Sequence, residues 1–377
     1  MDALILFSVF LLMTLAFLFV FFASNNKVVF HAHGLRHQVC LFLLVVIPIF
    51  VWGLVLAGFR PVDVGFDTPR YVETFLNLDG VFTARMVGES YYGNTEFLLW
   101  PFQSLLKPFL SVRGWLVFNY CLVFFLVYLY YRGSAKALGF SSAIFALVFL
   151  TFFLVYAGNT MRQVLAIPIG ALGFQLYRRG NFFGGLFAIF IAIGFHWSSI
   201  MFLAAPAFSL GFFKRDRVYL LMPLLALFSS VFLMDLVGFV IALIDVPMLT
   251  DRFNLYFSEG RVSHVGHVWE KANFWICSIT ALVFFYVCRP SRYSDNVLHQ
   301  YVVLFLSLVF FGITNADFSE RYMPYILLVI PLLVAMIADR ISIPAFAKNF
   351  IFLGFFLVLG ALVFASGSSQ QTLGYSF

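Results

Sequence analysis

Long apolar runs, almost uninterrupted by charge, recur along this chain from its first residues to about residue 366. Soluble domains carry roughly a quarter charged residues, whereas here 11% are charged and 63% are hydrophobic. The mean hydropathy is +0.98. A run of about 20 apolar residues is long enough to cross the hydrocarbon core of a bilayer. Lipid must therefore be the solvent for most of the chain, and helices satisfy the backbone there.

This pattern predicts an all-α, polytopic transmembrane helix bundle that forms a single domain over residues 1–377. About twelve spans are expected, several of them short and interrupted by Gly or Pro, as in bundles that surround a polar cavity. The first is interpreted as a retained helix and not as a signal peptide, because no basic residues precede it. The expected ranges are 2–23, 39–58, 113–131, 140–157, 163–177, 182–196, 198–212, 218–243, 272–288, 297–313, 322–338 and 349–366.

Residues 96–110 are also apolar, but they contain Pro101, Lys107 and Pro108. Reading this segment as re-entrant or interfacial puts 13 of the 23 Lys and Arg, and only three of the 17 Asp and Glu, into short loops on one side. That asymmetry is the positive-inside pattern. The opposite, outer side then carries both termini and two long loops, 59–95 and 244–271.

Two outer-side segments place an ionisable group at the end of a span. Arg162, in GNTMRQ at 158–163, precedes an apolar helix, and a guanidinium beside free helix N–H groups suits an anion such as phosphate. The alternative is an interfacial arginine that snorkels to the headgroups. His196, in FHWSS at 195–199, suits proton transfer near neutral pH. The alternative is a hydrogen-bonded histidine at a helix break.

Two more segments are expected on the same side. NADFSERY at 315–322 contains Arg321, which either contributes to a site or pairs with a neighbouring acid in a structural role. DTPRY at 67–71 combines a carboxylate, an arginine and an aromatic ring, a set that suits a sugar phosphate or glycan, although a solvated loop is the alternative. Because the topology puts all four segments on one side, we predict a common outward-facing site.

The second long loop contains charged residues that could cover this site. Its His264 and His267 could bind a metal, but a third ligand is not evident. The sequence has no P-loop, dinucleotide fingerprint, His-Glu-x-x-His or Asp-x-Asp motif. We therefore expect no cofactor, no metal-bound nucleotide sugar and no nucleic-acid partner. The charged and histidine residues of the loop are Arg252, Arg261, His264, His267 and Glu270.

Five short motifs occur in order between roughly residues 50 and 340: Asp67-x-x-x-Tyr71, NTEF at 94–97, MRQVLA at 161–166, HWSS at 196–199 and ERY at 320–322. In these motifs the chain resembles the EpsG family of bacterial Wzy-type polysaccharide polymerases. It departs from the family pattern at NT before Glu96, where a more Gly- and Tyr-like approach is usual. It departs again at Trp197, which replaces a small residue or Pro. Both departures bear on fine specificity.

The resemblance implies a multi-pass glycosyltransferase of the bacterial inner membrane, with its active face in the periplasm. Such enzymes polymerise O-antigen or exopolysaccharide. They move a growing glycan from undecaprenyl diphosphate onto the terminal sugar of an incoming undecaprenyl-diphosphate-linked unit. A chain-length regulator protein is the usual partner.

For that reaction, arginines should stabilise the diphosphate leaving group without a metal, Arg162 first and Arg321 second. The acceptor hydroxyl needs a base, for which His196 leads and Asp67 and Glu96 are alternatives. The other expected substrate-binding residues are Arg70, Tyr71, Gln163 and Tyr322.

Two other functions remain open on the sequence alone. An O-antigen ligase or another lipid-linked glycosyltransferase needs the same arginines, and differs in adding one unit instead of a ladder. A transporter of lipid-linked glycan would place charges near the bilayer midplane and often show inverted repeats, neither of which is visible here.

Overall fold

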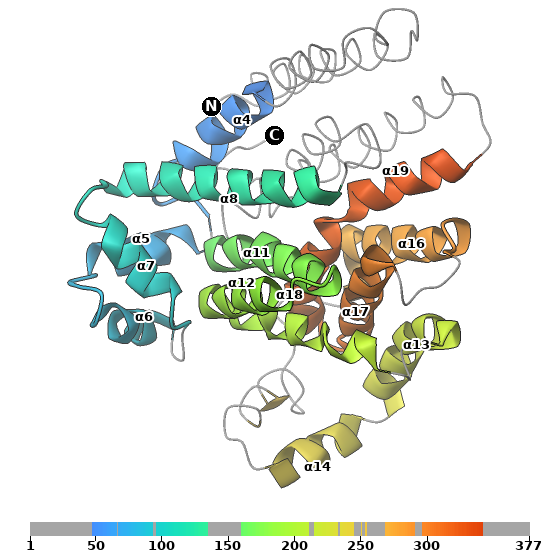
Figure 1. Cartoon of the computed structure of the whole chain (residues 1–377). Coiled ribbons are helices and arrows are strands. Elements are labelled where there is room, and N and C mark those ends of the chain that lie inside the picture. The colour runs from blue at the N-terminus through green and yellow to red at the C-terminus, as the bar shows by residue number, and fades with distance from the viewer. Residues whose placement is uncertain are drawn as a thin grey trace, which may run out of the picture. The chain divides into compact units, whose positions relative to one another are not determined.

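The computed structural model describes residues 47–65, 67–92, 96–134, 160–210, 215–232, 234–244, 250, 253–254, 268–290 and 296–341. Over these residues it contains 13 α-helices and no strand (Figure 1), in agreement with the predicted all-α class. The chain packs into two compact units. The first contains the described residues within 1–173 and 183–200 together with residue 341, and the second contains those within 174–182 and 201–340.

The described part of the first unit contains one π-helical turn and seven α-helices. In chain order these are α4 (Ile47–Gly53), the π-helix η2 (Leu54–Gly58), α5 (Thr68–Leu76), α6 (Ala84–Tyr92), α7 (Leu99–Leu106), α8 (Val112–Ser134), α11 (Met161–Arg178) and α12 (Phe182–Phe195). The last residues of α11 and the first residue of α12 belong to the second unit.

Among the described helices, α8 alone is long and apolar enough to cross a membrane, over Val112–Tyr131. Four shorter apolar helical segments accompany it: Phe182–Phe195, Trp197–Ser209, Ala272–Val287 and Val297–Phe311. Three of the expected spans, 2–23, 140–157 and 349–366, lie outside the described residues. The count of about twelve spans therefore stays a prediction.

The first long loop contains two helices, α5 and α6, which the sequence analysis did not predict. Asp67 occupies the N-cap position of α5 and Pro69 follows in the first turn, where the missing N–H of proline costs nothing. The helix is amphipathic: it buries Tyr71, Val72 and Phe75. This alternation of buried and exposed positions lets the segment fold on the surface of the unit.

Helix α7 covers only eight residues, too few to cross a bilayer, and it is fixed to α5. Lys107, directly after α7, donates hydrogen bonds from Nζ to the carbonyl oxygens of Leu76, at 2.6 Å, and Leu78, at 2.5 Å. A cation at these carbonyls satisfies the free acceptors at the end of α5 and suits the helix dipole. The lysine inside this apolar segment thus has a structural role.

A buried polar cluster joins α7 to α8. Gln103 Nε2 donates to Asn119 Oδ1 at 3.0 Å, and Trp115 Nε1 donates to Gln103 Oε1. Phe75 of α5 stacks on Trp115 with 4.4 Å between ring centroids. Because each of these buried polar groups is paired, α5, α7 and α8 are held in one arrangement.

Helices α11 and α12 lie side by side (Figure 1). At Gly173 a Cβ atom would come within 2.9 Å of Ile189 N and the Gly185 carbonyl oxygen. Small residues at such a crossing let two helix backbones approach closely, as in membrane bundles. The turn between the helices contains Gly180, whose φ of 96° suits glycine.

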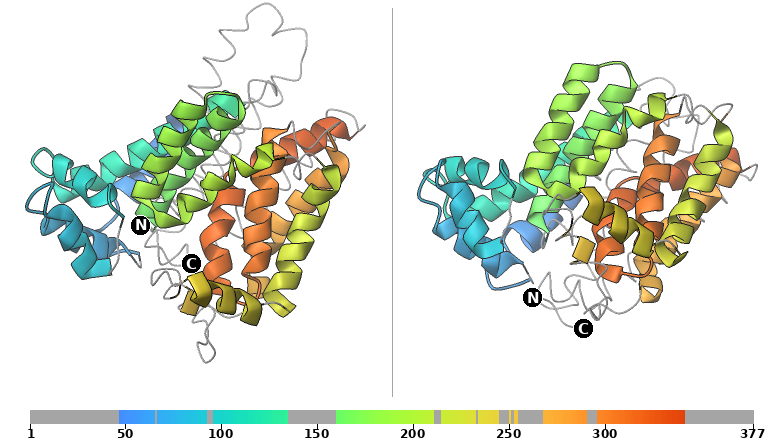
Figure 2. Two further views of the ribbon diagram at one scale, coloured as in Figure 1. Left: turned by 60° about the horizontal axis from the view of Figure 1, so that its bottom comes forward. Right: turned by 90° about the horizontal axis from the view of Figure 1, so that it is seen from below.

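The second unit is built around α17 (Val297–Phe311), which contacts α13, α16 and α18 (Figure 2). All residues of α17 from His299 to Ser307 are buried, so this helix is interior to its unit. The other described elements are the 3₁₀ helices η5 (Trp197–Ala204, which begins in the first unit), η6 (Ala207–Ser209) and η8 (Val268–Glu270), and the helices α13 (Asp216–Phe232), α14 (Met234–Ile244), α16 (Ala272–Val287), α18 (Ala316–Leu327) and α19 (Ile330–Arg340).

Three expected spans of the second unit differ in the structure. In the range 198–212, the described residues up to Leu210 contain two 3₁₀ helices, with Pro206 at the N-cap of the second. The range 218–243 is divided between α13 and α14. The range 322–338 is divided between α18 and α19, whose second residue is Pro331. Proline lacks the N–H that would continue the preceding helix, and it is favoured in a first turn.

Candidate active site

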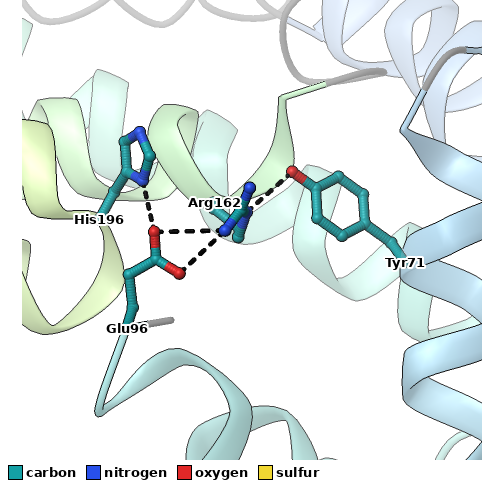
Figure 3. Close-up of polar contacts among 4 residues, drawn as sticks. All are labelled: Tyr71, Glu96, Arg162 and His196. Atoms are coloured by element: carbon teal, nitrogen blue, oxygen red, sulfur yellow. Dashed lines mark hydrogen bonds and ion pairs between the residues drawn. The ribbon is translucent and has the colours of Figure 1, made fainter. Parts of the chain in front are cut away.

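Glu96 lies at the centre of a buried polar network in the first unit (Figure 3). Arg162 Nη1 donates to its carboxylate, at 3.0 Å to Oε2 and 3.4 Å to Oε1. On the other side, Oε1 lies 2.6 Å from Nδ1 of His196. The Glu96 side chain is 2% exposed and that of His196 is 8% exposed. Charges this deeply buried are tolerated only with close partners.

Two tyrosines hold Arg162 from its other side. Its Nε donates to the Tyr71 hydroxyl at 3.2 Å, and its Cζ lies 4.3 Å from the centroid of the Tyr92 ring. Arg70 approaches the same ring, with Cζ 4.6 Å from the centroid. Arg162 Nη2 makes no hydrogen bond to a described residue, and the side chain is 20% exposed. The guanidinium therefore keeps a donor that a ligand can reach.

Packing beneath the tyrosines fixes their positions. Tyr92 stacks on Trp100 of α7, with 5.7 Å between ring centroids. Gly88, one turn before Tyr92 on α6, leaves room for this indole, since a Cβ there would lie 2.1 Å from Trp100 Cδ1. The aromatic residues thus form a rigid support for Arg162.

The chain around Glu96 is fastened to the end of α12. Leu98 N donates to the Gly194 carbonyl oxygen at 2.9 Å, and the Leu98 side chain fills the space that a Cβ on Gly194 would need. Phe97 meets Trp197 edge to face. His196 lies within this segment, and its N–H continues α12 by donating to the Ala192 carbonyl. The same backbone contacts therefore place Glu96 opposite His196.

Arg162 is positioned by its place as the second residue of α11. The next turns are anchored in the core, since Val164, Leu165 and Ile167 are fully buried. Gln163 follows on the helix and is 8% exposed. The apolar run after the arginine thus holds its charged group at the helix start, beside Glu96.

Electrostatics keep the Glu96 carboxylate ionised. Burial raises its pKa, but the hydrogen bond from His196 and the charges of His196 and Arg162 outweigh burial and lower it to about 2. Burial raises the pKa values of the Tyr71 and Tyr92 phenols, so both are neutral at pH 7. Glu96 is then too weak a base to deprotonate a hydroxyl efficiently.

The arrangement suits a histidine base oriented by a carboxylate. Because Glu96 is ionised, His196 Nδ1 carries a proton and donates it to Oε1 in a hydrogen bond; when the ring is neutral, its lone pair is therefore on Nε2. A carboxylate that fixes the histidine tautomer in this way also stabilises the imidazolium that forms when the ring accepts a proton.

The other predicted residues of the first long loop lie near this network. Asp67 caps α5 through its carbonyl oxygen, which accepts from Tyr71 N at 2.9 Å, and its charge contributes to the raised pKa of Tyr71. Arg70 contacts Tyr92, as described above. The motif residues Asn94, Thr95, Gly158 and Asn159 lie outside the described residues.

Arg321 and Tyr322 belong to the second unit, and their place in a common site with Arg162 stays a prediction. Arg321 is exposed on α18, while Tyr322 is 6% exposed and packs against Phe318, with 5.0 Å between ring centroids. In the same segment Glu320 Oε1 lies 3.5 Å from Lys271 Nζ. The second-loop residues Arg252, Arg261, His264 and His267 lie outside the described part.

The sequence reasoning missed Arg60, which is 3% exposed and has a charge that interacts with Tyr71. No signal in the sequence distinguishes it from an arginine that snorkels at the end of an apolar run. Within the described residues, no three His, Cys, Asp or Glu side chains are grouped to hold a metal ion.

Comparison with known proteins agrees with the resemblance seen in the five motifs. No curated protein and no solved structure matches the chain significantly. The family model described as EpsG family matches residues 41–377, which include every residue of the buried network. Membership in this family implies a membrane protein of exopolysaccharide biosynthesis. The chain belongs to the EpsG family.

Proposed function

We propose that this protein is a polysaccharide polymerase of the bacterial inner membrane that joins undecaprenyl-diphosphate-linked repeat units at the periplasmic face. The observation that carries the proposal is the buried Tyr71–Arg162–Glu96–His196 network. It combines a cation that a ligand can reach with a histidine base, and family membership supplies the glycan context.

In the proposed reaction, the hydroxyl oxygen of the acceptor sugar attacks the anomeric carbon of the growing chain. The bond from that carbon to the diphosphate oxygen breaks, and its electron pair leaves with the diphosphate. His196 takes the acceptor proton, because Glu96 orients the ring and stabilises its positive charge.

Arg162 stabilises the negative charge that develops on the departing diphosphate. Its Nη2 makes no hydrogen bond to a described residue, and binding of the diphosphate can draw the guanidinium partly away from Glu96, since hydrogen bonds in an active site can tighten or rearrange on substrate binding. Tyr71 keeps the guanidinium oriented through Nε. In this scheme Arg321, Gln163, Tyr322 and Arg70 remain proposed glycan- or phosphate-binding residues.

The proposal is tested by the surface glycan of cells that lack the protein and are complemented with wild type or Arg162→Ala at matched protein level. We expect a ladder of repeat lengths from the wild type and only single-unit product from Arg162→Ala. Arg85→Ala is the matched control, because Arg85 forms an exposed pair with Glu89 at 2.9 Å on α6.

A ladder from Arg162→Ala would remove Arg162 from the mechanism. If wild type changes no glycan, the polymerase assignment fails and transport of lipid-linked glycan becomes the better explanation. If wild type adds one unit and never a ladder, the protein is a ligase or a single-addition glycosyltransferase.

A further inference from the structure

Arg60 is a buried guanidinium without a counter-ion among the residues that the structure describes. It follows η2 and is 3% exposed, and its Nε and Nη1 atoms are shielded from water without a hydrogen bond to any described residue. Asp63, the nearest acid in sequence, is exposed at the surface. Buried charges are almost always paired, so this side chain requires an explanation.

The charge of Arg60 is not removed by its surroundings. Burial lowers its pKa, although only to about 10, so the group is a cation at neutral pH. Tyr71 is the side chain whose charge would favour that cation. Burial raises the pKa of the Tyr71 phenol, which is therefore neutral and supplies no counter-charge.

Tyr71 also relates Arg60 to the candidate active site, because the same hydroxyl accepts the hydrogen bond from Arg162. Around Tyr71 and Tyr92 lie three arginines, Arg60, Arg70 and Arg162, while the carboxylates that act on Tyr71 are Asp67 and Glu96. Glu96 is already paired with Arg162. The surroundings of Tyr71 thus have an excess of positive charge, and Nε and Nη1 of Arg60 have no hydrogen-bond partner among the described residues.

We propose that Arg60 is the second cation of the donor site and binds one phosphate of a lipid diphosphate while Arg162 binds the other. This inference rests on the proposed function. A diphosphate esterified at both ends carries roughly one negative charge on each phosphate, and each planar guanidinium presents parallel donors to phosphate oxygens. Two arginines that both interact with Tyr71, one through a hydrogen bond and one through its charge, therefore suit a diphosphate better than a monophosphate.

The proposal makes a distinctive prediction for stability. Replacing a structural, paired arginine destabilises a protein. Removing an unpaired buried charge instead removes its unfavourable desolvation free energy from the ligand-free protein. Arg60→Met is therefore expected to leave the melting temperature of the ligand-free protein unchanged or higher. A ligand that binds the folded protein raises the melting temperature in proportion to its affinity.

The experiment uses the purified full chain in lipid nanodiscs, with undecaprenyl diphosphate as the probe. Affinity is measured from ligand-dependent melting shifts for wild type, Arg60→Met, Arg60→Lys and the control Arg85→Met. We expect Arg60→Met to lose at least about tenfold in affinity for the diphosphate and less than about threefold for undecaprenyl monophosphate. Arg60→Lys should recover part of the loss, since it keeps the charge without the fork.

Phosphatidylglycerol in excess distinguishes a headgroup site from a donor site. If it competes with the probe in wild type and not in Arg60→Met, Arg60 binds ordinary lipid headgroups and the proposal fails. Equal diphosphate affinity in wild type and Arg60→Met overturns only this inference, and so does a lower melting temperature of ligand-free Arg60→Met. If wild type binds no undecaprenyl diphosphate, this inference fails together with the donor named in the proposed function, and the glycan ladder tests polymerisation independently.

Discussion

Each unit of the protein places a carboxylate beside a cation, but the two pairs differ in burial and geometry. In the first unit, Glu96 is 2% exposed and lies 3.0 Å from Arg162. In the second, Glu320 is 37% exposed and lies 3.5 Å from Lys271, which is 34% exposed. Exposed pairs contribute little because water screens them, whereas a buried pair is costly to break. The comparison agrees with the chemical role proposed for the first pair and with a surface role for the second.

The largest effect is expected for Arg162→Lys. Lysine keeps the charge, but it cannot bond Glu96 and Tyr71 at once and still present a donor to the diphosphate. Polymerisation by purified protein should fall about 1000-fold, or roughly 4 kcal/mol of transition-state stabilisation. Arg85→Lys serves as the control. Full activity of Arg162→Lys would show that only its charge matters, as for a surface pair.

Glu96→Gln is expected to have the next largest effect. Glutamine neither balances the Arg162 charge nor stabilises a protonated His196, so activity should fall about 100-fold, roughly 3 kcal/mol. The amount of polymer at matched protein level measures this loss. Retained activity would mean that His196 needs no carboxylate, and the comparison between the units would lose its main support.

The same carboxylate has a pH signature. Its pKa is lowered from 4.5 to about 2, so its stabilising contribution is complete above about pH 4.5 and is lost only as the pH falls toward 2. Infrared spectra of wild type minus Glu96→Gln should show no protonated-carboxyl band for Glu96 from pH 8 to pH 4. A band already present at pH 6 would contradict a strongly paired glutamate.

A smaller loss is expected for Tyr71→Phe, which removes one hydrogen bond to Arg162 and leaves the ring in place. Hydrogen bonds to charged groups contribute about 1.5 kcal/mol, equivalent to roughly tenfold in rate. Steady-state kinetics should show this loss mainly in kcat. An inactive Tyr71→Phe variant would instead give the hydroxyl a direct role in the reaction.

The smallest effect is expected at the Lys271–Glu320 pair. A double-mutant cycle with Lys271→Met and Glu320→Gln, measured by thermal unfolding, should give a coupling energy of about 0.5 kcal/mol or less. A coupling several times larger would mean that the pair is buried in the working protein, and the two units would then be alike.

The sequence predicted the helical class and singled out several residues of the buried network, because those features depend on local patterns. Apolar runs identify helices in lipid, and Arg162 and His196 stand out because charge is rare at such positions. The helix break before Pro331 is visible only weakly, because a proline is tolerated in spans whose neighbours repair the freed backbone groups. The folding of α5 and α6 within the first long loop depends on tertiary partners such as Trp115 and Lys107.

The pairing and the burial of the site residues could not be predicted from the sequence. Glu96 was an alternative base in the sequence interpretation, whereas its low pKa favours a positioning role that depends on two residues far along the chain. Arg60 was missed because the burial of its guanidinium results from tertiary packing, which the residues next to it in the sequence do not reveal. Distance along the chain hides these relations, since Glu96 is separated from its partners by 66 and 100 residues.

The attachment of Leu98 to Gly194 has a consequence for biogenesis. During synthesis, the ribosome delivers Glu96 long before α12 exists, so the nascent carboxylate has neither its arginine nor its histidine. An unpaired carboxylate is expensive in an apolar environment, so the segment from Glu96 to Leu98 must wait in the aqueous interface. It can dock only after α11 and α12 have been synthesised and have packed together, which makes assembly of the site a late step in the maturation of the protein.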